Sequence, residues 1–329
     1  MKVKVEKKPI VVPGFRFSGV ACGLKPSGKK DLSLLVSDVP ATTVAAFTTN
    51  HVKAAPVLVG QEHMKKGRIQ AVVVNSGNAN ASTARPGLQL ARDSCTLVGR
   101  TLGIDEQLVI PSSTGKIGVL PPWDNLQAGI QAACAALSPR GFWDALAGTM
   151  TTDAFPKAAT SQLVIDGTLI TIAGMAKGAG MINPNMATLL SYILTDVRIE
   201  RLALQQVLEE TLPDSFNAIS VDGDTSTNDT LLILANGVAN NREMGRRGKS
   251  LTLFKQAVGE IPPRTLAQRL VDLEEAGVLE RRVIDARPPR VEYLLTPRGR
   301  QLQSVLDALA LYSRADAGSP SGDPASRNP

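Results

Sequence analysis

The chain has 329 residues, 43% of them hydrophobic, and a formal net charge of +6. This length allows two or three domains, or one large unit with a small appendage. No apolar run approaches the roughly 20 residues that span a bilayer, and none follows the N-terminal lysines as it would in a signal peptide. With two histidines and three widely spaced cysteines, the sequence offers no disulfide framework, no zinc spacing and little for a Ser-His-Asp triad. We therefore expect a cytosolic protein with no membrane partner.

The first 240 residues mix short strands and helices. Val57–Val59 and Ile69–Val74 are β-branched runs ended by polar or Gly-rich turns, which favours strands. Trp123–Leu137 has apolar residues at helical spacing and is predicted to be a helix. Leu163–Ile172 places Asp166-Gly167 between two apolar runs, which predicts a hairpin with a two-residue turn. The mixture favours an α+β layered domain over a doubly wound parallel sheet.

The most informative segment runs from Lys177 to Thr188, where a Gly-rich polar loop ends and an apolar run begins. Gly178 and Gly180 permit backbone angles closed to other residues, and Pro184 argues against a helix. A hydroxyl at such a junction can be held in a cleft while the following strand anchors it in the core. A Thr hydroxyl needs a base, and one solution is its own α-amine, freed by chain cleavage. Spacing alone favours the simpler interpretation, a Gly-rich turn that leads into a buried strand.

Residues 177–196 resemble the self-cleavage site of the ornithine acetyltransferases, the bifunctional glutamate N-acetyltransferases of arginine biosynthesis. Further blocks resemble that family in the same order along the chain, up to about residue 260. These blocks are Gly14–Arg16, Gly19–Lys25, Phe47–Asn50, Ala54–Val57, Val74–Ala81, Ser113–Gly118, Thr151–Asp153, Ser215–Asn217 and Val221–Asp229. The resemblance implies an αββα layered sandwich that cleaves itself between Ala187 and Thr188, with Thr188 as the nucleophile.

The resemblance also implies the reaction. Acetyl would pass from N2-acetyl-L-ornithine to L-glutamate through an acetyl-Thr188 intermediate, giving L-ornithine and N-acetyl-L-glutamate. Acetyl-CoA is an alternative donor in bifunctional members, and the sequence leaves its use open; no other cofactor is expected. The cleaved α and β chains are expected to associate as a heterotetramer. After Glu260 the sequence lacks the family's acidic Asp-Gly-Glu-Gly-Ala-Thr-Lys segment and its terminal Asn and Thr contacts, so we expect a truncated domain over 1–260 and an impaired activity.

Acyl transfer also needs donors for the oxyanion and groups that bind the substrate. Thr114 and Gly115 are the best oxyanion candidates, because Gly115 lets backbone N–H groups approach a ligand; a plain turn is the alternative. Lys177 aligns with the family's substrate-binding lysine and is predicted to bind a carboxylate, the alternative being a solvated surface lysine. Thr152 matches a substrate-contacting threonine of the family, and the sequence leaves open whether Thr151 beside it makes that contact.

The loop Asp222–Asn228 resembles a calcium-binding loop in its alternating oxygen-bearing side chains. Its sixth position is Thr227 rather than Gly, and its twelfth is Ile233 rather than Glu. We therefore reject calcium binding there and predict no metal site.

Beyond residue 260 the character of the sequence changes. Residues 1–241 hold 21 Lys+Arg and 19 Asp+Glu, whereas residues 242–314 hold 14 and 9, so the basic excess lies late in the chain. Pro263–Ala276 is predicted to be a helix, Val278–Ile284 and Val291–Leu295 to be strands, and Thr296-Pro297 to open a last helix that runs to about Leu311. Residues 317–329, rich in Gly, Ser, Pro, Asp and Asn, are predicted to be disordered.

This order resembles the second half of a winged-helix regulator of the HxlR type, over about 261–316. The matching blocks are Pro263–Leu270, Leu273-Glu274, Gly277–Leu279, Pro289–Tyr293 and Leu295–Gly299. The early helices of that family are not recognisable, unless Leu251–Glu260 substitutes for one. We expect weak, non-specific DNA binding at most. The alternatives are a DNA-binding regulator that carries a non-functional acetyltransferase-like domain, and a basic, solvated module acquired by fusion or frameshift.

Overall fold

The computed structural model describes residues 9–153, 155–178, 190–213, 215, 226–260, 273–274, 276–284 and 290–302. The chain forms two compact units, Met1–Pro263 and Arg264–Pro329. The predicted cleavage site, Ala187 and Thr188, lies outside the described residues, as does the tail at 317–329. The domain boundary at residue 260 stays a prediction.

A mixed sheet of eight strands forms the centre of the first unit. Its order is β4-β3-β2-β8-β7-β6-β5, and β1 pairs with β2. Neighbours run antiparallel except for the pairs β3–β4 and β7–β8, which are parallel. The strands are β1 (Phe15–Val20), β2 (Leu32–Phe47), β3 (Arg68–Asn78), β4 (Val109–Lys116), β5 (Lys157–Ile165), β6 (Thr168–Lys177), β7 (Leu190–Thr195) and β8 (Thr230–Ala235).

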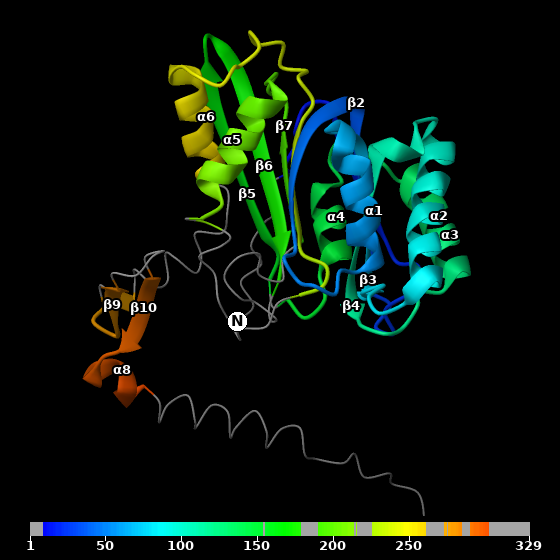
Figure 1. Cartoon of the computed structure of the whole chain (residues 1–329), viewed down its shortest axis with the longest axis horizontal. Helices are drawn as coiled ribbons and strands as arrows, with labels where there is room; N and C mark the ends of the chain where they lie inside the picture. Colours follow the sequence, from blue (N-terminus) through cyan, green and yellow to red (C-terminus); the bar gives the residue numbers. More distant parts are fainter. Residues whose placement is uncertain are drawn as a thin grey trace, which may run out of the picture. The chain divides into compact units, whose positions relative to one another are not determined.

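Helices lie on the outer side of each half of this sheet (Figure 1). The group α1–α3 packs against β2–β4, and α5 and α6 pack against β5–β8. The helices are α1 (Ala55–His63), α2 (Ala84–Leu102), α3 (Trp123–Ala135), α4 (Phe142–Thr149), α5 (Arg201–Thr211) and α6 (Lys249–Gly259), with the 3-10 turns η1 (Met64–Lys66) and η2 (Glu106–Leu108). In the described part of the chain, no helix is both long and apolar enough to cross a membrane.

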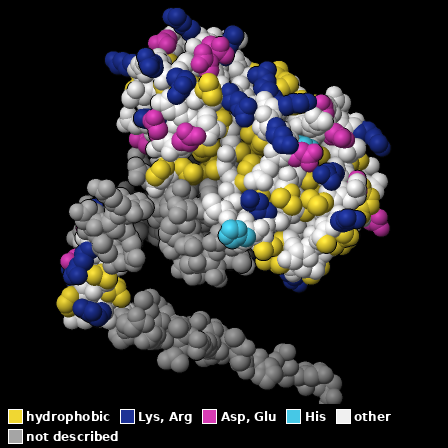
Figure 2. Space-filling view, viewed as in Figure 1, with side chains coloured by type: hydrophobic (Ala, Val, Ile, Leu, Met, Phe, Trp, Pro, Cys, Tyr) yellow, Lys and Arg dark blue, Asp and Glu magenta, His cyan; other side chains and the backbone are white. Residues whose placement is uncertain are grey.

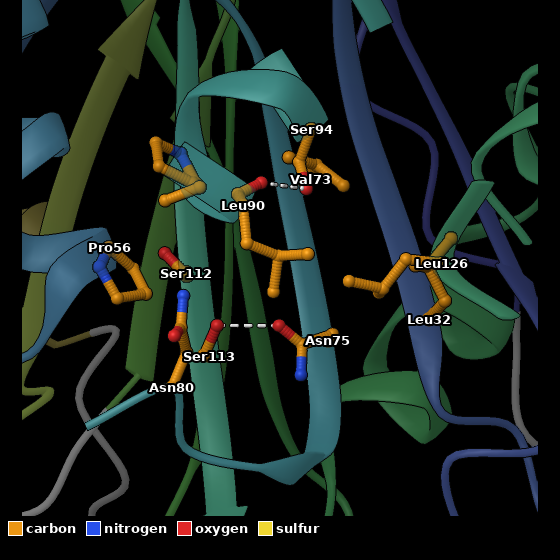
Figure 3. Close-up of a pocket in the computed structure, with 12 residues that line it drawn as sticks. Leu32, Pro56, Val73, Asn75, Asn80, Leu90, Ser94, Ser112, Ser113 and Leu126 are labelled. Carbon is orange, nitrogen blue, oxygen red and sulfur yellow. Dashed lines mark hydrogen bonds between the residues drawn. The ribbon is translucent and has the colours of Figure 1, made fainter. Parts of the chain in front are cut away.

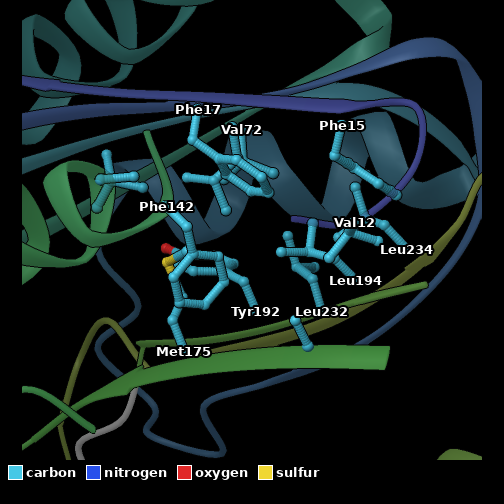
Figure 4. Packing of buried hydrophobic residues seen from close by; sticks show 14 of the residues in the cluster. Val12, Phe15, Phe17, Val72, Phe142, Met175, Tyr192, Leu194, Leu232 and Leu234 are labelled. Atoms are coloured by element: carbon cyan, nitrogen blue, oxygen red, sulfur yellow. The ribbon is translucent and has the colours of Figure 1, made fainter. Parts of the chain in front are cut away.

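The long strand β2 belongs to both halves of the sheet. Its first part pairs with β1 and β3 and its last part with β8, and its register with β3 shifts between Val36 and Ala41. A bulge of this kind bends a strand. The two halves share one inner core, in which side chains of β1 and β3 meet those of β6–β8 (Figure 4). Among these side chains are Phe15, Phe17, Val72, Met175, Tyr192 and Leu232.

Alternation along the strands builds the outer cores. In β3, Val72 and Val74 face the shared inner core, whereas Ala71 and Val73 face the helices α2 and α3. In the other half of the sheet, Ile233 of β8 packs against α5 and α6 in the same way. The layers are therefore helices, half-sheet, half-sheet, helices, which confirms the α+β sandwich that the sequence predicted.

Several predicted elements are confirmed and one is wrong. The helix predicted from Trp123 is α3, and the hairpin is β5–β6, where Asp166 and Gly167 have φ of 49° and 80°, as a primed turn requires. Val57–Val59 is not a strand but part of α1. Pro56 lies in the first helical turn, where its missing N–H costs nothing, so α1 can begin there despite the β-branched residues.

The second unit contains the strand pair β9 (Leu279–Ile284) and β10 (Arg290–Leu295), followed by α8 (Pro297–Gln301). These elements confirm the predicted strands and the start of the last helix; its continuation to Leu311 lies outside the described residues, as does most of the helix predicted over 263–276. Thr296 caps α8 by accepting a hydrogen bond from Gly299 N at 3.0 Å. Leu251–Glu260 does not supply a helix for this unit, because α6 packs in the core of the first unit through Leu251 and Phe254.

Charged side chains of both signs occur on the face of the first unit that Figure 2 shows. On the face in view, Lys and Arg side chains are spread among Asp and Glu side chains rather than gathered in one patch (Figure 2). This agrees with the near balance of 21 basic and 19 acidic residues over positions 1–241.

Candidate active site

Several strand ends come together at one end of the sandwich. Leu190, the first residue of β7, pairs with both Lys177 of β6 and Thr230 of β8. A series of backbone hydrogen bonds continues from there to the end of β4. These bonds are Thr48 N to Asp229 O (2.9 Å), Ala54 N to Thr227 O (2.9 Å), Ala55 N to Asn80 O (3.2 Å) and Ala79 N to Lys116 O (2.8 Å). The predicted residues Thr114, Gly115 and Lys177 therefore belong to the same end of the fold.

Thr114 and Gly115 lie near the end of strand β4, where both pair with β3, rather than in a plain turn. Thr114 is buried and pairs with Ser76, and Gly115 pairs with Gly77. Gly115 has φ of 132°, and a Cβ at this position would lie 2.3 Å from the carbonyl carbon of Gly77. Only glycine fits there without a backbone shift, and the exposed backbone at Gly115 is open to a ligand.

Lys177 is buried, with 4% of its surface exposed, so it is not a solvated surface lysine. Its Nζ donates a hydrogen bond to Thr151 Oγ1 at 3.4 Å. Burial lowers the pKa of Lys177 to about 8, with Asp153 and Asp229 opposing the shift and Lys157 and Lys25 adding to it. An ammonium so placed gains from the approach of a carboxylate, because it recovers part of the charge stabilisation lost on leaving water.

The loop after α4 holds the predicted threonines. Thr151 and Thr152 are both exposed, and Thr151 is the one whose hydroxyl meets Lys177. The next residue, Asp153, has a side chain only 1% exposed. Its carboxylate accepts hydrogen bonds from Lys157 Nζ (2.7 Å), Gly178 N (2.8 Å) and Thr151 N (3.2 Å). Burial alone would raise the pKa of Asp153, but the hydrogen bond from Lys157 and the two backbone N–H groups outweigh it and lower the pKa.

Sequence reasoning gave Asp153 no role. A signal was available, since Asp153 directly follows Thr151-Thr152 in a block matched to the family. Lys25 and Asp31, which lie on the other side of the same loop, were also missed, although Lys25 ends a matched block. A carboxylate or a lysine in a loop shows nothing of its burial until distant segments are brought together.

A small cavity of about 20 Å³ lies beside Ser112 and Ser113 of β4 (Figure 3). Ser113 Oγ donates a hydrogen bond to Asn75 Oδ1 at 2.5 Å, and Asn75 Nδ2 donates to Asn78 O at 2.9 Å. This space suits about one water molecule and no substrate. The polar network instead fixes the ends of β3 and β4 relative to each other.

The three cysteines offer no competing nucleophile. Burial raises the pKa of Cys22 to about 12, with a contribution from Asp31, and that of Cys134 to about 11. Burial also raises the pKa of Cys95. Thiols with such pKa values hold almost no thiolate at neutral pH.

The sequence is similar to known proteins over most of its length. Residues 16–284 match the ArgJ family. The arginine biosynthesis bifunctional protein ArgJ of Caldanaerobacter subterraneus subsp. tengcongensis is 45% identical over 277 residues, which cover 83% of this chain and 68% of that protein. The ArgJ of Symbiobacterium thermophilum is 50% identical over 230 residues, which cover 69% of this chain and 57% of that protein.

A solved structure gives the same result for the fold. The crystal structure of ArgJ from Bacillus halodurans is 36% identical to this chain, with a TM-score of 0.51, and covers 56% of this chain and 96% of its own. The match with the curated relatives spans about three fifths to two thirds of their length. On this sequence and structural similarity, the chain belongs to the ArgJ family.

Proposed function

We propose that this chain transfers an acetyl group from N2-acetyl-L-ornithine to L-glutamate through an ester on Thr188. The observation that carries the proposal is the buried ammonium of Lys177, which lies opposite Leu190 in the β6–β7 pair. Thr188 precedes Leu190 by two residues, and two residues span at most about 7 Å. A nucleophile at 188 is thus tethered close to a cation suited to a substrate carboxylate. Relatives named bifunctional proteins of arginine biosynthesis support the same chemistry.

Cleavage between Ala187 and Thr188 prepares the nucleophile. The Thr188 hydroxyl oxygen attacks the Ala187 carbonyl, the peptide C–N bond breaks, and water hydrolyses the resulting ester. The freed α-amine has a reference pKa of about 7.7–8.0, which suits a base near neutrality.

Transfer then proceeds in two halves. The Thr188 oxygen attacks the acetyl carbon of acetylornithine while the α-amine accepts the hydroxyl proton. The amide C–N bond breaks, and the proton passes to the departing ornithine nitrogen. The amine of glutamate next attacks the ester, the C–O bond breaks, and Thr188 recovers its proton. Thr114 and Gly115 supply the donors that stabilise the oxyanion in both halves.

Lys177 binds the substrate carboxylate, and the loop with Thr151 and Thr152 borders the same site. Since Thr151 Oγ1 already accepts from Lys177, the exposed Thr152 is the better candidate for a separate substrate contact. Acetyl-CoA as an alternative donor, a heterotetramer of cleaved chains, and a cytosolic location remain part of the proposal. No metal is required.

Intact mass and acetyl transfer test this function together. Wild-type protein should separate into residues 1–187 and 188–329 and should move labelled acetyl from acetylornithine to glutamate. Thr188→Ala should stay whole and inactive, whereas Thr101→Ala, on the exposed face of α2, should behave as wild type. A single uncut chain with full activity would disprove the mechanism. An uncut and inactive wild type would instead assign the loss to the C-terminal part of the relatives that this chain does not match.

A second candidate function concerns the second unit. The antiparallel pair β9–β10 and the capped helix α8 support a winged-helix hairpin over 261–316, with Arg281, Arg290 and Arg298 among its basic residues. Such a unit binds duplex DNA with an affinity that falls steeply as salt increases, because phosphate contacts release counterions. Titrating a labelled duplex with the whole chain at two salt concentrations tests this. Tight, sequence-specific binding would make the chain a regulator, and no binding at low salt would leave the unit a basic appendage.

A further inference from the structure

We propose that Lys25 is a positioning residue, which holds the substrate loop 150–153 against Lys177 by binding the carbonyl oxygen of Met150. The proposal rests on the acetyl transfer proposed above, and it assigns a function to a residue that lies far before Thr188 in the sequence. Three sets of hydrogen bonds carry it: those that fix the backbone around Lys25, those from Lys25 Nζ to the loop, and those from the loop to Lys177 and Gly178.

Asp31 fixes the backbone around Lys25. Its carboxylate is fully buried and accepts three backbone hydrogen bonds, from Cys22 N (2.7 Å), Leu24 N (2.7 Å) and Lys25 N (2.9 Å). Asp31 is itself held at the start of β2, because its carbonyl accepts a hydrogen bond from Ser76 N at 2.8 Å. A carboxylate that is buried and satisfied by three N–H groups is a rigid support for the turn that presents the Lys25 side chain.

The Lys25 ammonium joins two segments far apart in the sequence. Its Nζ donates to the carbonyl oxygens of Lys30 and Met150, both at 2.6 Å. Within the described residues, no carboxylate lies within ion-pair distance of it. The side chain of Lys25 is half-buried, and its ammonium binds two backbone carbonyl oxygens rather than a carboxylate. Its acceptor in the loop, Met150, directly precedes Thr151.

The loop then reaches Lys177 through its own contacts. Thr151 Oγ1 accepts from Lys177 Nζ, and Asp153 accepts from Gly178 N, the residue after Lys177. Lys25 holds the beginning of the loop and Asp153 holds its end. Without Lys25, Thr151 and Thr152 lose their fixed position relative to Lys177 while the fold keeps its sheet and cores.

The charge of Lys25 adds a second effect. The groups that face Lys177 are Asp153 and Asp229, which favour its charged form, and Lys157 and Lys25, which oppose it together with burial. Removing the charge at position 25 should therefore raise the pKa of Lys177. Water admitted by a displaced loop would raise this pKa as well, because burial is its main cause of lowering, so a variant that keeps the charge at position 25 separates the two effects. Replacing Lys25 by Arg keeps the charge but cannot place a compact ammonium on two carbonyls.

The experiment compares Lys25→Met, Lys25→Arg and the control Lys66→Met, which removes an exposed lysine that donates a hydrogen bond to Gln107 Oε1. KM and kcat for acetylornithine are measured from pH 6.5 to 10 after intact mass has shown cleavage. We expect Lys25→Met to raise KM about tenfold, the loss of one hydrogen bond to a charged group, with a smaller change in kcat. In Lys25→Met, the increase of KM with pH should begin at a higher pH than in wild type. Lys25→Arg should raise KM at every pH, and its increase of KM should begin at the same pH as in wild type.

A second readout does not depend on activity. Competitive acetylation with trace acetic anhydride, read by mass spectrometry, gives the pKa of the Lys177 amine in wild type and variants. Lys25→Met should raise it, and Lys25→Arg and Lys66→Met should not. An unchanged KM in Lys25→Met, or a Lys177 amine that titrates as in wild type, overturns the proposal. If wild type fails to acetylate glutamate, the proposed function is refuted but the proposal for Lys25 is not. The labelling experiment still decides whether Lys25 affects the pKa of Lys177.

Discussion

Gly115 lies directly opposite Gly77 in the parallel pair β3–β4, and both have positive φ, 132° and 120°. The two backbones approach so closely that a Cβ on Gly115 would lie 2.3 Å from the carbonyl carbon and 2.4 Å from the carbonyl oxygen of Gly77. The position of the proposed oxyanion donors is therefore set by contact between two strands and not by a flexible turn.

Gly115→Ala should lower kcat about a hundredfold, the effect of losing one oxyanion donor, because the end of β4 must move away from Gly77. Gly118→Ala is the matched control. Gly118 also has positive φ (80°), but nothing lies within 4 Å of an added Cβ, so only backbone strain of about 1 kcal/mol is expected. Single-turnover kinetics and thermal unfolding of both variants separate the two effects. Equal loss of kcat in both would contradict a role specific to Gly115.

Lys177→Ala should raise KM for acetylornithine by about ten- to a hundredfold, because a hydrogen bond between charged groups is lost, and should leave cleavage intact. Intact mass and steady-state kinetics measure both. Lys66→Met again provides the control for removal of one lysine charge. Unchanged kinetics with normal cleavage would show that no substrate group meets Lys177.

The pH dependence follows from the lowered pKa of Lys177. Its ammonium is present below about pH 8 and is lost as pH rises through that value, whereas an ordinary lysine would keep its charge to about 10.5. KM should therefore rise above pH 8, by up to about tenfold per unit, as the charged partner of the carboxylate disappears. The same rise should vanish in Lys177→Ala. A KM that stays flat to pH 10 in wild type would contradict this assignment.

Local chemistry made some of the fold predictable. Asp166-Gly167 specifies a primed turn on its own, and the apolar spacing from Trp123 specifies α3. The run Val57–Val59 misled because β-branched residues favour strands only weakly, and Pro56 with tertiary packing against β4 decides for a helix. No local sequence pattern predicted that β2 would extend over 16 residues and bend between two half-sheets.

The site was predictable to a similar degree. Thr114, Gly115 and Lys177 were found through blocks that resemble a family, and they belong to one end of the fold. Asp153 and Lys25 were missed because their importance comes from burial and from partners as far as 125 residues away. A single sequence without neighbours in space cannot distinguish such residues from solvated charges.

Asp153→Asn should destabilise the protein by about 3 kcal/mol near pH 7, since it leaves the Lys157 ammonium and two backbone donors without their buried carboxylate. Folding lowers the pKa of Asp153 below 3.8, so its contribution is complete above that value and is lost as pH falls through the lowered pKa. The difference in unfolding free energy between wild type and Asp153→Asn should therefore shrink toward pH 3. Asp38→Asn, which removes an exposed partner of Arg16, should cost less than about 1 kcal/mol. Urea unfolding at pH 7 and pH 3 measures all of these, and a difference that persists unchanged at pH 3 would show that the charge of Asp153 does not support the loop.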